Sequence, residues 1–224
     1  MARRNPLALA VLSCLEERPM HPYEISTTLR SRGKEQSIKL NYGSLYSVVE
    51  SLQKAGLIAA RETTREGRRP ERTVYEITAA GSAELADWLA ELLSTPTREY
   101  TSLEAGLSLM PSLPPQDVAL LLGQRAQALR IELRTLEAMF AEAAELDLPE
   151  VFLVEGRFRE AMLRAELTFV TDLAAGISGG ALSGVKGWRR MHELRAEGVP
   201  FEEIIRDPVR YLGEEGRHLQ PPGG

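Results

Sequence analysis

The sequence has little of what secreted and membrane proteins rely on. Cys14 is the single cysteine among 224 residues, so no disulfide can form within the chain, and a reducing cytoplasm is the expected compartment. In the run LALAVLSCLEE this thiol is expected to be a buried, small apolar group. The run is too short to span a membrane, and charged residues follow it where a signal peptide would need a cleavage site. We therefore expect neither export nor a membrane partner.

The signatures of catalysis, metal binding and cofactor binding are also missing. The three histidines, His21, His192 and His218, are scattered and form no metal-ligand spacing with carboxylates or cysteine. No nucleophile signature surrounds the serines. In the glycine-rich stretch AGISGGALSGVKGW, Val185 separates Gly184 from Lys186 and no strand precedes it, so it is not a phosphate-binding loop. We predict a protein that is not an enzyme and has no cofactor or metal.

There is no overall excess of positive charge, because the net charge is −5. Residues 1–78 contain 13 Lys/Arg and 9 Asp/Glu, a balance of +4, and residues 79–224 contain the remaining 14 and 23, a balance of −9. Such a chain would not bind polyanions indiscriminately, and any contact with nucleic acid must be local and lie in the first part.

The first part of the sequence, residues 1–95, predicts several short helices and a hairpin in close succession. The patterns predict helices over residues 6–17 and about 22–32, then a third helix that begins near Asn41 and ends at Gly56. Two β-prone runs around a tip with glycine and proline predict a hairpin over residues 57–78. The run AAGSAELADWLAELL predicts a further helix directly after it.

The rear part is predicted to be almost entirely helical. A helix opening at Pro114 and Pro115 has an apolar residue every four and three positions, which is typical of a coiled-coil seam: Leu122, Ala126, Leu129, Leu133, Leu136, Phe140 and Ala143. Packing within the chain and packing against another chain both remain open. A second helix over about 150–175 has Phe158, Met162, Ala165 and Phe169 on one stripe.

The remaining residues are expected to be less regular. We predict a flexible connection over the glycine-rich stretch, short helices near 188–197 and 201–206, and a disordered end at QPPGG. The predicted domains are residues 1–95, residues 96–176 and a partly helical extension over 177–224.

The third helix has two different faces on a helical wheel. Leu45, Val48, Val49 and Leu52 fall on one side, and the other side is small and polar. Asn41 is a candidate N-cap, and a helix N-terminus attracts phosphate. Gly43 leaves its backbone accessible, and Ser44, Tyr46 and Ser47 can bind phosphate or base edges. Taken alone, an ordinary polar surface helix fits equally well, and Glu50 would repel phosphate.

The hairpin that follows favours DNA. Its tip, REGRRPER, contains four arginines, which suit a narrow minor groove: Arg65, Arg68, Arg69 and Arg72. Two glutamates in the tip dilute this charge. A basic hairpin directly after a three-helix unit can lie beside the groove that the third helix occupies.

These motifs together resemble the PadR family of winged-helix transcriptional regulators. The resemblance rests on Gly-Ser-Leu-Tyr at 43–46, Leu-Gln-Lys-Ala-Gly-Leu at 52–57, Tyr-Glu-Ile-Thr at 75–78 with Gly81, and His-Pro-Tyr-Glu-Ile at 21–25. It covers about residues 6–95 closely. Ser47 stands where proline is common in the family, and residues 177–224 cannot be matched to it.

The resemblance implies a mainly α fold, with a winged helix-turn-helix and a C-terminal helical dimerisation domain. It also implies a homodimeric regulator of double-stranded DNA, usually a repressor on a palindromic operator. The expected DNA-binding residues are Asn41, Tyr42, Gly43, Ser44, Tyr46, Ser47, Lys54, Arg65, Arg68, Arg69 and Arg72. The alternative is a winged helix that binds protein and not DNA.

A small-molecule effector is the remaining partner to consider. In some relatives an aromatic residue near the dimer centre stacks on flat ligands. The candidates for an effector site or dimer interface are Trp88, Phe140, Phe158 and Phe169. Their alternative role is packing in the core.

Overall fold

A computed structural model of the chain describes residues 5–38, 41–64 and 72–219. The chain divides into two compact units, Met1–Glu99 and Tyr100–Gly224, and each is treated by itself. Within the described residues, no helix combines the length and apolar character needed to cross a membrane.

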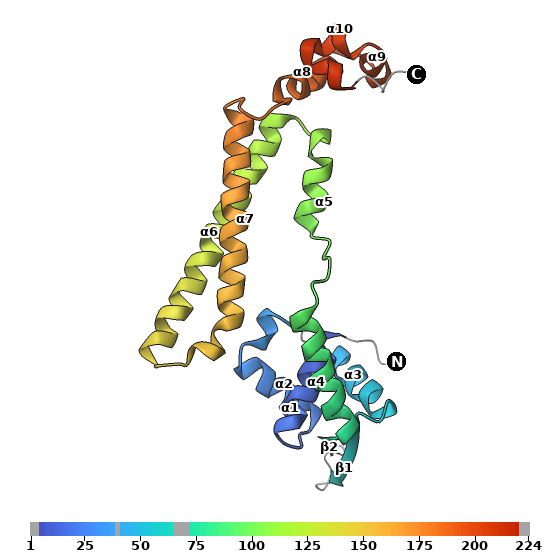
Figure 1. Ribbon diagram of the computed structural model, residues 1–224, viewed down its shortest axis with the longest axis vertical. Helices are drawn as coiled ribbons and strands as arrows, with labels where there is room; N and C mark the ends of the chain where they lie inside the picture. Colours follow the sequence, from blue (N-terminus) through green and yellow to red (C-terminus); the bar gives the residue numbers. More distant parts are fainter. Residues whose placement is uncertain (1–4, 39–40, 65–71, 220–224) are drawn as a thin grey trace. The chain divides into compact units, whose positions relative to one another are not determined.

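The first unit has the predicted order of elements (Figure 1). Three helices are followed by two strands and a fourth helix: α1 Pro6–Glu17, α2 Pro22–Ser31, α3 Tyr42–Lys54, β1 Ile58–Thr64, β2 Arg72–Ile77 and α4 Ala79–Ser94. A short 3-10 turn, Lys34–Gln36, joins α2 to α3. The mainly α fold with a hairpin is therefore confirmed.

Side-chain caps fix where these helices start. The Asn5 side chain accepts a hydrogen bond from the amide of Ala8 at 2.9 Å, directly before Pro6 at the first helical position. At α2, the His21 ring accepts from the amide of Tyr23, and the Glu24 carboxylate accepts from the amide of His21. These contacts satisfy amides that have no partner inside the helix, and they set the helix boundaries.

The core of this unit forms around α1. Val11 and Leu12 are fully buried, and Ile25 from α2 and Leu45 from α3 pack into the same cluster. Cys14 lies there too, 1% exposed, and this burial raises the pKa of its thiol. The thiol is the buried apolar group that the sequence predicted.

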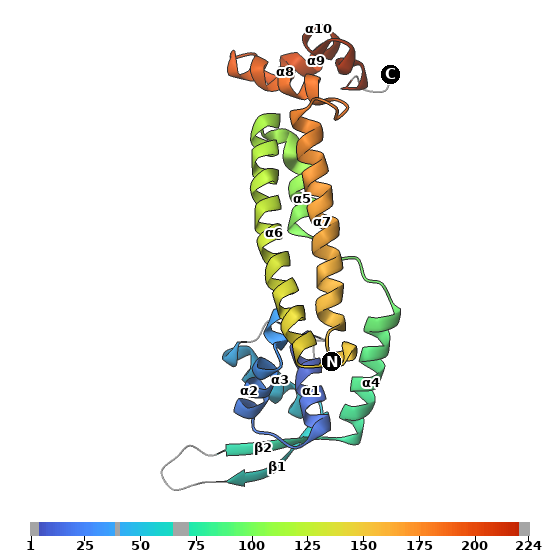
Figure 2. The same cartoon turned by 90° about the vertical axis from the view of Figure 1, so that its left-hand side faces the viewer.

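β1 and β2 form an antiparallel hairpin and lie side by side in Figure 2. Ile58 pairs with Ile77, and the register shifts between Ala60 and Glu62. Beyond the two strands, Met20 and Tyr75 exchange two backbone hydrogen bonds of 3.0 Å. The hairpin is thus bound to the segment between α1 and α2.

The second unit is helical throughout its described part. Its elements are α5 Ser102–Leu109, α6 Pro115–Glu145, α7 Val154–Ser178, α8 Val185–Ala196, α9 Phe201–Arg206 and α10 Pro208–Leu212, with 3-10 turns at Met110–Ser112, Glu150–Phe152 and Gly213–Leu219. Helix α5 was not predicted from the sequence. The predicted start of α7 was four residues early, because a 3-10 turn precedes that helix.

The apolar seam of α6 packs against α7 of the same chain. Leu122, Ala126 and Leu129 are buried in one cluster with Val170 and Ile177 from α7, and Figures 1 and 2 show the two helices side by side. Ion pairs join them along their length: Arg125 to Glu166 at 2.6 Å, Arg159 to Glu132 at 2.5 Å and Arg164 to Glu137 at 2.7 Å. Of the two roles left open for the seam, packing within the chain is the one observed.

The predicted flexible connection over the glycine-rich stretch was wrong. Helix α7 continues to Ser178, and the amide of Leu182 donates to the carbonyl of Gly176 at 3.0 Å. Gly180 and Gly184 adopt positive φ of 72° and 85°, which glycine tolerates without strain. Val185, 1% exposed, starts α8 inside the cluster formed by α6 and α7. The glycines therefore build a tight turn that returns the chain onto α6.

Candidate nucleic-acid interface

Helix α3 is anchored by the face that the wheel predicted. Leu45, Val49 and Leu52 are each at most 2% exposed, and Val48 packs against the same core. Gly56, at φ 73°, then ends the helix: its amide donates to the carbonyl of Gln53, and the amide of Leu57 donates to that of Leu52. This C-cap turns the chain directly into β1.

The opposite face of α3 is open. Gly43, Ser44 and Ser47 are exposed, and the Tyr46 side chain is 49% exposed. The structure thus brings these predicted residues together at the first turns of one helix. Tyr42 begins the helix, but its side chain lies outside the described part.

Asn41 caps this helix as predicted. Its side-chain oxygen accepts from the amide of Ser44 at 2.7 Å. The Ser47 hydroxyl donates to the carbonyl of Gly43 at 3.0 Å. Its oxygen can still accept, but its proton is used, so Ser47 would accept from a base amine more readily than it would donate to phosphate.

The described residues give no geometric reason for a glycine at position 43. Its φ is not positive, and among these residues a Cβ built there would meet only the Asn41 side-chain oxygen, at 3.6 Å, an ordinary contact. Glycine disfavours helix formation relative to alanine. A glycine without a local reason on an open helix face suits the close approach of a partner's backbone.

Glu50, the acid on this face, is paired with Lys54. The lysine ammonium donates to the Glu50 carboxylate at 2.5 Å, one helical turn apart, and this hydrogen bond holds the pKa of the carboxyl below its ordinary value. The pair is therefore intact near neutral pH. It reduces the repulsion that Glu50 would exert on phosphate and also occupies Lys54, one of the predicted DNA contacts.

Glu50→Gln should release Lys54 and strengthen binding to duplex DNA of arbitrary sequence. If Lys54 then reaches a phosphate, the salt slope of log K should become steeper by about one. Fluorescence anisotropy at several salt concentrations measures this. Asp87→Asn on α4 removes the same charge away from α3 and should leave the slope unchanged; an equal response in both variants would contradict the pairing.

The base of the hairpin is described, but its tip is not. Arg61 in β1 pairs with Glu76 in β2 at 3.8 Å. Arg72 opens β2 opposite Thr64, although its side chain lies outside the described part. Arg65, Arg68 and Arg69 lie outside the described residues, so the DNA contacts expected from the hairpin tip stay predictions.

Thr78 joins the hairpin to the helices. Its hydroxyl lies 2.8 Å from the carbonyl oxygen of Gly56 and 3.0 Å from that of Leu57, and it accepts from the amide of Gly81 at 3.1 Å. One residue therefore caps α4 and holds the turn between α3 and β1. From the sequence, Thr78 was noted only within the Tyr-Glu-Ile-Thr motif. Its place directly before a predicted helix is the signal for an N-cap.

The four aromatic candidates lie in different environments. Trp88 is 6% exposed within the core of the first unit, which is the packing role left as its alternative. In the second unit, Phe140 is half-buried with the Arg157 guanidinium 4.1 Å from its ring centre. Phe158 and Phe169 are 69% and 52% exposed.

Comparison with known proteins supports a regulator over an ordinary polar surface helix. Residues 11–87 match the model of the transcriptional regulator PadR-like family. This part of the chain, residues 11–87, is similar to PadR-like transcriptional regulators. The matched residues contain α2, α3 and the hairpin, which make up the surface described above. A search of the curated proteins found no match.

Several solved structures have a fold similar to that of this chain. Bacillus subtilis PadR in complex with operator DNA aligns at a TM-score of 0.53 and 20% identity, over 73% of this chain and 98% of that one. The same protein with p-coumaric acid aligns at 0.58 and 15%, over 77% and 97%. The Vibrio cholerae virulence activator AphA aligns at 0.57 and 17%, over 77% and 98%. The alignments cover these chains almost completely, whereas about a quarter of the present chain has no counterpart in them.

Proposed function

We propose that the protein acts in the cytoplasm as a homodimer that represses transcription from a palindromic operator, with α3 as the reading helix. The observation that carries this proposal is the start of α3. An N-terminus capped by Asn41 presents Gly43, Ser44 and Tyr46 on an open face, while Leu45 and Leu52 fix the opposite face in the core. Such a helix can approach a phosphate with its free amides while its side chains meet base edges.

The role of each residue follows from its chemistry. Gly43 allows the close approach, and the Ser44 and Tyr46 hydroxyls can donate to phosphate or base. Ser47 accepts from a base amine, because its proton is bound to Gly43. Tyr42 and Asn41 flank the first turn. The B. subtilis PadR structure with operator DNA supports this use of the fold.

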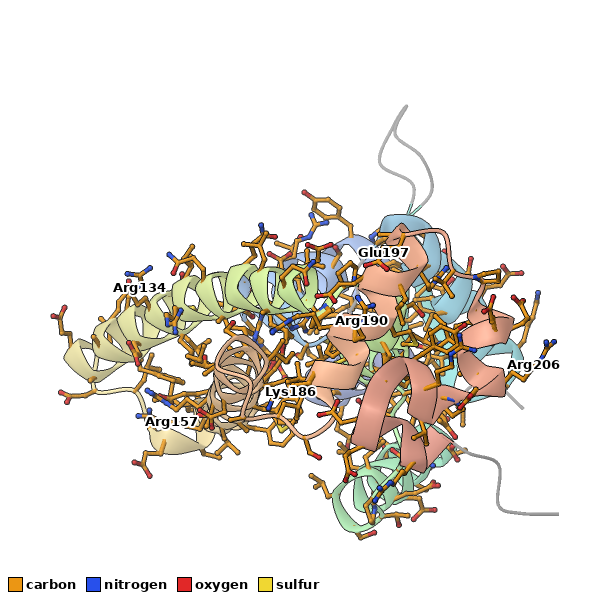
Figure 3. The ribbon with its side chains drawn as sticks, turned by 90° about the horizontal axis from the view of Figure 1, so that it is seen from above. Arg134, Arg157, Lys186, Arg190, Glu197 and Arg206 are labelled. Carbon is orange, nitrogen blue, oxygen red and sulfur yellow. The ribbon has the colours of Figure 1, made fainter. Side chains whose placement is uncertain are left out.

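The arginine-rich tip is proposed to contact the adjacent minor groove. In the double variant Arg68→Ala/Arg69→Ala, the dependence of log K on log salt should flatten by about two, since each lost phosphate contact removes a slope of about 0.9. A gel-shift series from low to moderate salt measures the slope. The matched control is Arg130→Ala/Arg134→Ala on α6, where Arg134 projects from the helix in Figure 3. An unchanged slope in Arg68→Ala/Arg69→Ala would mean that the hairpin tip does not contact DNA.

A second copy of the chain is proposed to cover the outer face of α7. Phe158, Met162 and Phe169 recur along that helix and are more than half exposed, and a row of large apolar side chains in water favours association. A two-fold pair of winged helices also doubles the few phosphate contacts that one unit can make.

Dimerisation can be measured directly. Sedimentation equilibrium should give about twice the chain mass of 24.8 kDa. Phe158→Lys/Phe169→Lys should shift the protein towards the monomer, while Leu109→Lys, at an equally exposed leucine of α5, should not. A dimer that survives the double substitution would place the interface elsewhere.

Footprinting tests the function as a whole. The purified protein, applied to the DNA upstream of its own gene and its neighbours, should protect two half-sites centred one helical turn apart or a multiple of it. Deletion of the gene should raise expression from the protected promoter. Lower expression would make the protein an activator, as the name of the V. cholerae neighbour describes that protein. Protection of no sequence would favour a winged helix that binds protein.

Control by a small-molecule effector is part of the proposal. The B. subtilis PadR structure with p-coumaric acid supports it. Of the four aromatic candidates, Phe158 and Phe169 have the exposure that a ligand or a second chain requires, whereas Trp88 is buried in its own core.

A further inference from the structure

A hollow of about 680 Å³ lies in the second unit where α6, the end of α7 and the start of α8 meet. Its apolar side is formed by Ala119, Leu120 and Gly123 of α6 with Ile177 of α7. Leu120 is 63% exposed at this place although it is a large apolar residue. The volume falls within the range of sites that hold small molecules.

The polar side of the hollow has a single charge. Arg189 from α8 is the one ionised residue among those that line it, and no carboxylate lines it. The other polar residues are neutral: Gln116, Gln124, Gln127 and Ser178. One guanidinium with neutral hydrogen-bonding groups around it suits one negative charge on a ligand.

Arg189 differs from the arginine next to it. Arg190 is bound to Glu193 at 3.3 Å and Glu197 at 3.2 Å on its own helix, and Figure 3 labels Arg190 and Glu197 along α8. Arg189 forms no ion pair within the described part of the chain. Two adjacent arginines thus give one saturated guanidinium and one available to a ligand.

Gly123 provides a separate observation. It lies in the middle of the long helix α6, where glycine is less favourable than alanine, and its φ is not positive. A Cβ built there would meet nothing within 4 Å among the residues that the structure describes, so no helix packing seen in them requires the glycine. What its missing side chain provides is space in the wall of the hollow.

We propose that this hollow binds a small organic monoanion, a carboxylate with an apolar body. The carboxylate would bind the Arg189 guanidinium through two hydrogen bonds, and the apolar body would cover Leu120, Gly123 and Ile177. A neighbouring hollow of about 740 Å³ shares Arg189 and Gln116 but is also lined by Glu193. That carboxylate would repel an anion, so the first hollow is the favoured one.

Calorimetry with three eight-carbon probes tests the charge requirement. Octanoate, octanol and octylammonium have the same chain with negative, zero and positive charge. Octanoate should bind the full-length protein about tenfold more tightly than octanol or octylammonium, since only it pairs with Arg189. Equal affinities, or no binding of octanoate, would overturn the proposal.

Substitutions then locate the site. Arg189→Gln should weaken octanoate binding about tenfold or more, while the matched control Arg190→Gln should change it by less than about twofold. Gly123→Leu should abolish binding without loss of thermal stability, because its side chain enters open space and a better helix former replaces glycine. Equal losses in the two arginine variants would place the anion elsewhere.

Trp188 gives a local signal. It lies beside Arg189 in α8, with its ring N–H donating to the carbonyl of Leu113 at 2.9 Å. In the Trp88→Phe background it is the single tryptophan, because the chain has two, and octanoate should change its fluorescence with the affinity found by calorimetry. If the Trp88→Phe protein folds poorly, calorimetry of Arg189→Gln and Arg190→Gln, each made in the wild-type chain, is the deciding test.

Binding at this hollow is measured without DNA, so its failure and the failure of the proposed function are distinguishable. Only the further step, that the anion acts as the effector, rests on the proposed function. In that case octanoate should change operator affinity in the wild-type protein and Arg190→Gln, but not in Arg189→Gln. A change that persists in Arg189→Gln would separate the hollow from regulation.

Discussion

Replacing Gly81 by alanine should unfold or severely destabilise the winged helix. A Cβ on Gly81 would lie 2.1 Å from the carbonyl oxygen of Leu57 and 2.7 Å from Cγ1 of Ile77. The first obstacle is backbone at the start of β1, and it also accepts the hydrogen bond from the amide of Thr78. The carbonyl oxygen cannot move without shifting the hairpin, so we expect a loss of about 3 kcal/mol or more in the free energy of unfolding.

Chemical denaturation followed by circular dichroism measures this loss. Gly43→Ala serves as the matched control, because it makes the same change near the start of another helix of the same unit, where the new Cβ has room. If Gly81→Ala is as stable as the control, the packing of α4 against the hairpin differs from that described. Gly81→Ala should also abolish DNA binding, since the hairpin and α3 share this junction.

Gly81 and Thr78 illustrate what the sequence could and could not provide. The order of helices and strands followed from periodicity and from Gly and Pro, because these determine local structure. The buried face of α3 followed from spacing alone. Thr78 holds the turn at Gly56 and Leu57, and Gly81 passes close to Leu57. Each of these contacts joins residues more than twenty positions apart. Local patterns do not encode them.

In the second unit, too, local structure was predictable from the sequence and long-range contacts were not. The α6 seam was visible, but its partner was not, because a heptad pattern is satisfied equally by a helix of the same chain or of another. The glycine-rich stretch was taken for a flexible connection because composition does not reveal that Val185 returns to the α6–α7 core. In the candidate DNA site, the residue types were predictable, while the pairing of Glu50 with Lys54 depended on side-chain conformation.

Gly43→Ala is the prediction that most sharply separates reading DNA from maintaining the fold. Alanine fits at this position and favours the helix, so the free energy of unfolding should stay the same or rise by up to about 1 kcal/mol. If the first turn of α3 approaches a phosphate or base edge closely, the added methyl group must displace that contact. The affinity for the operator should then fall by about tenfold or more, equivalent to about 1.4 kcal/mol or more.

The two measurements are made on the same purified variant, by thermal unfolding and by anisotropy with the footprinted operator. Gly106→Ala in α5, where a Cβ would meet no described atom within 4 Å, should change neither quantity much. An unchanged operator affinity in Gly43→Ala would mean that the N-terminus of α3 stays clear of the DNA. Lost affinity with unchanged stability would assign Gly43 to the contact surface, because no atom in the described part of the chain requires a glycine there.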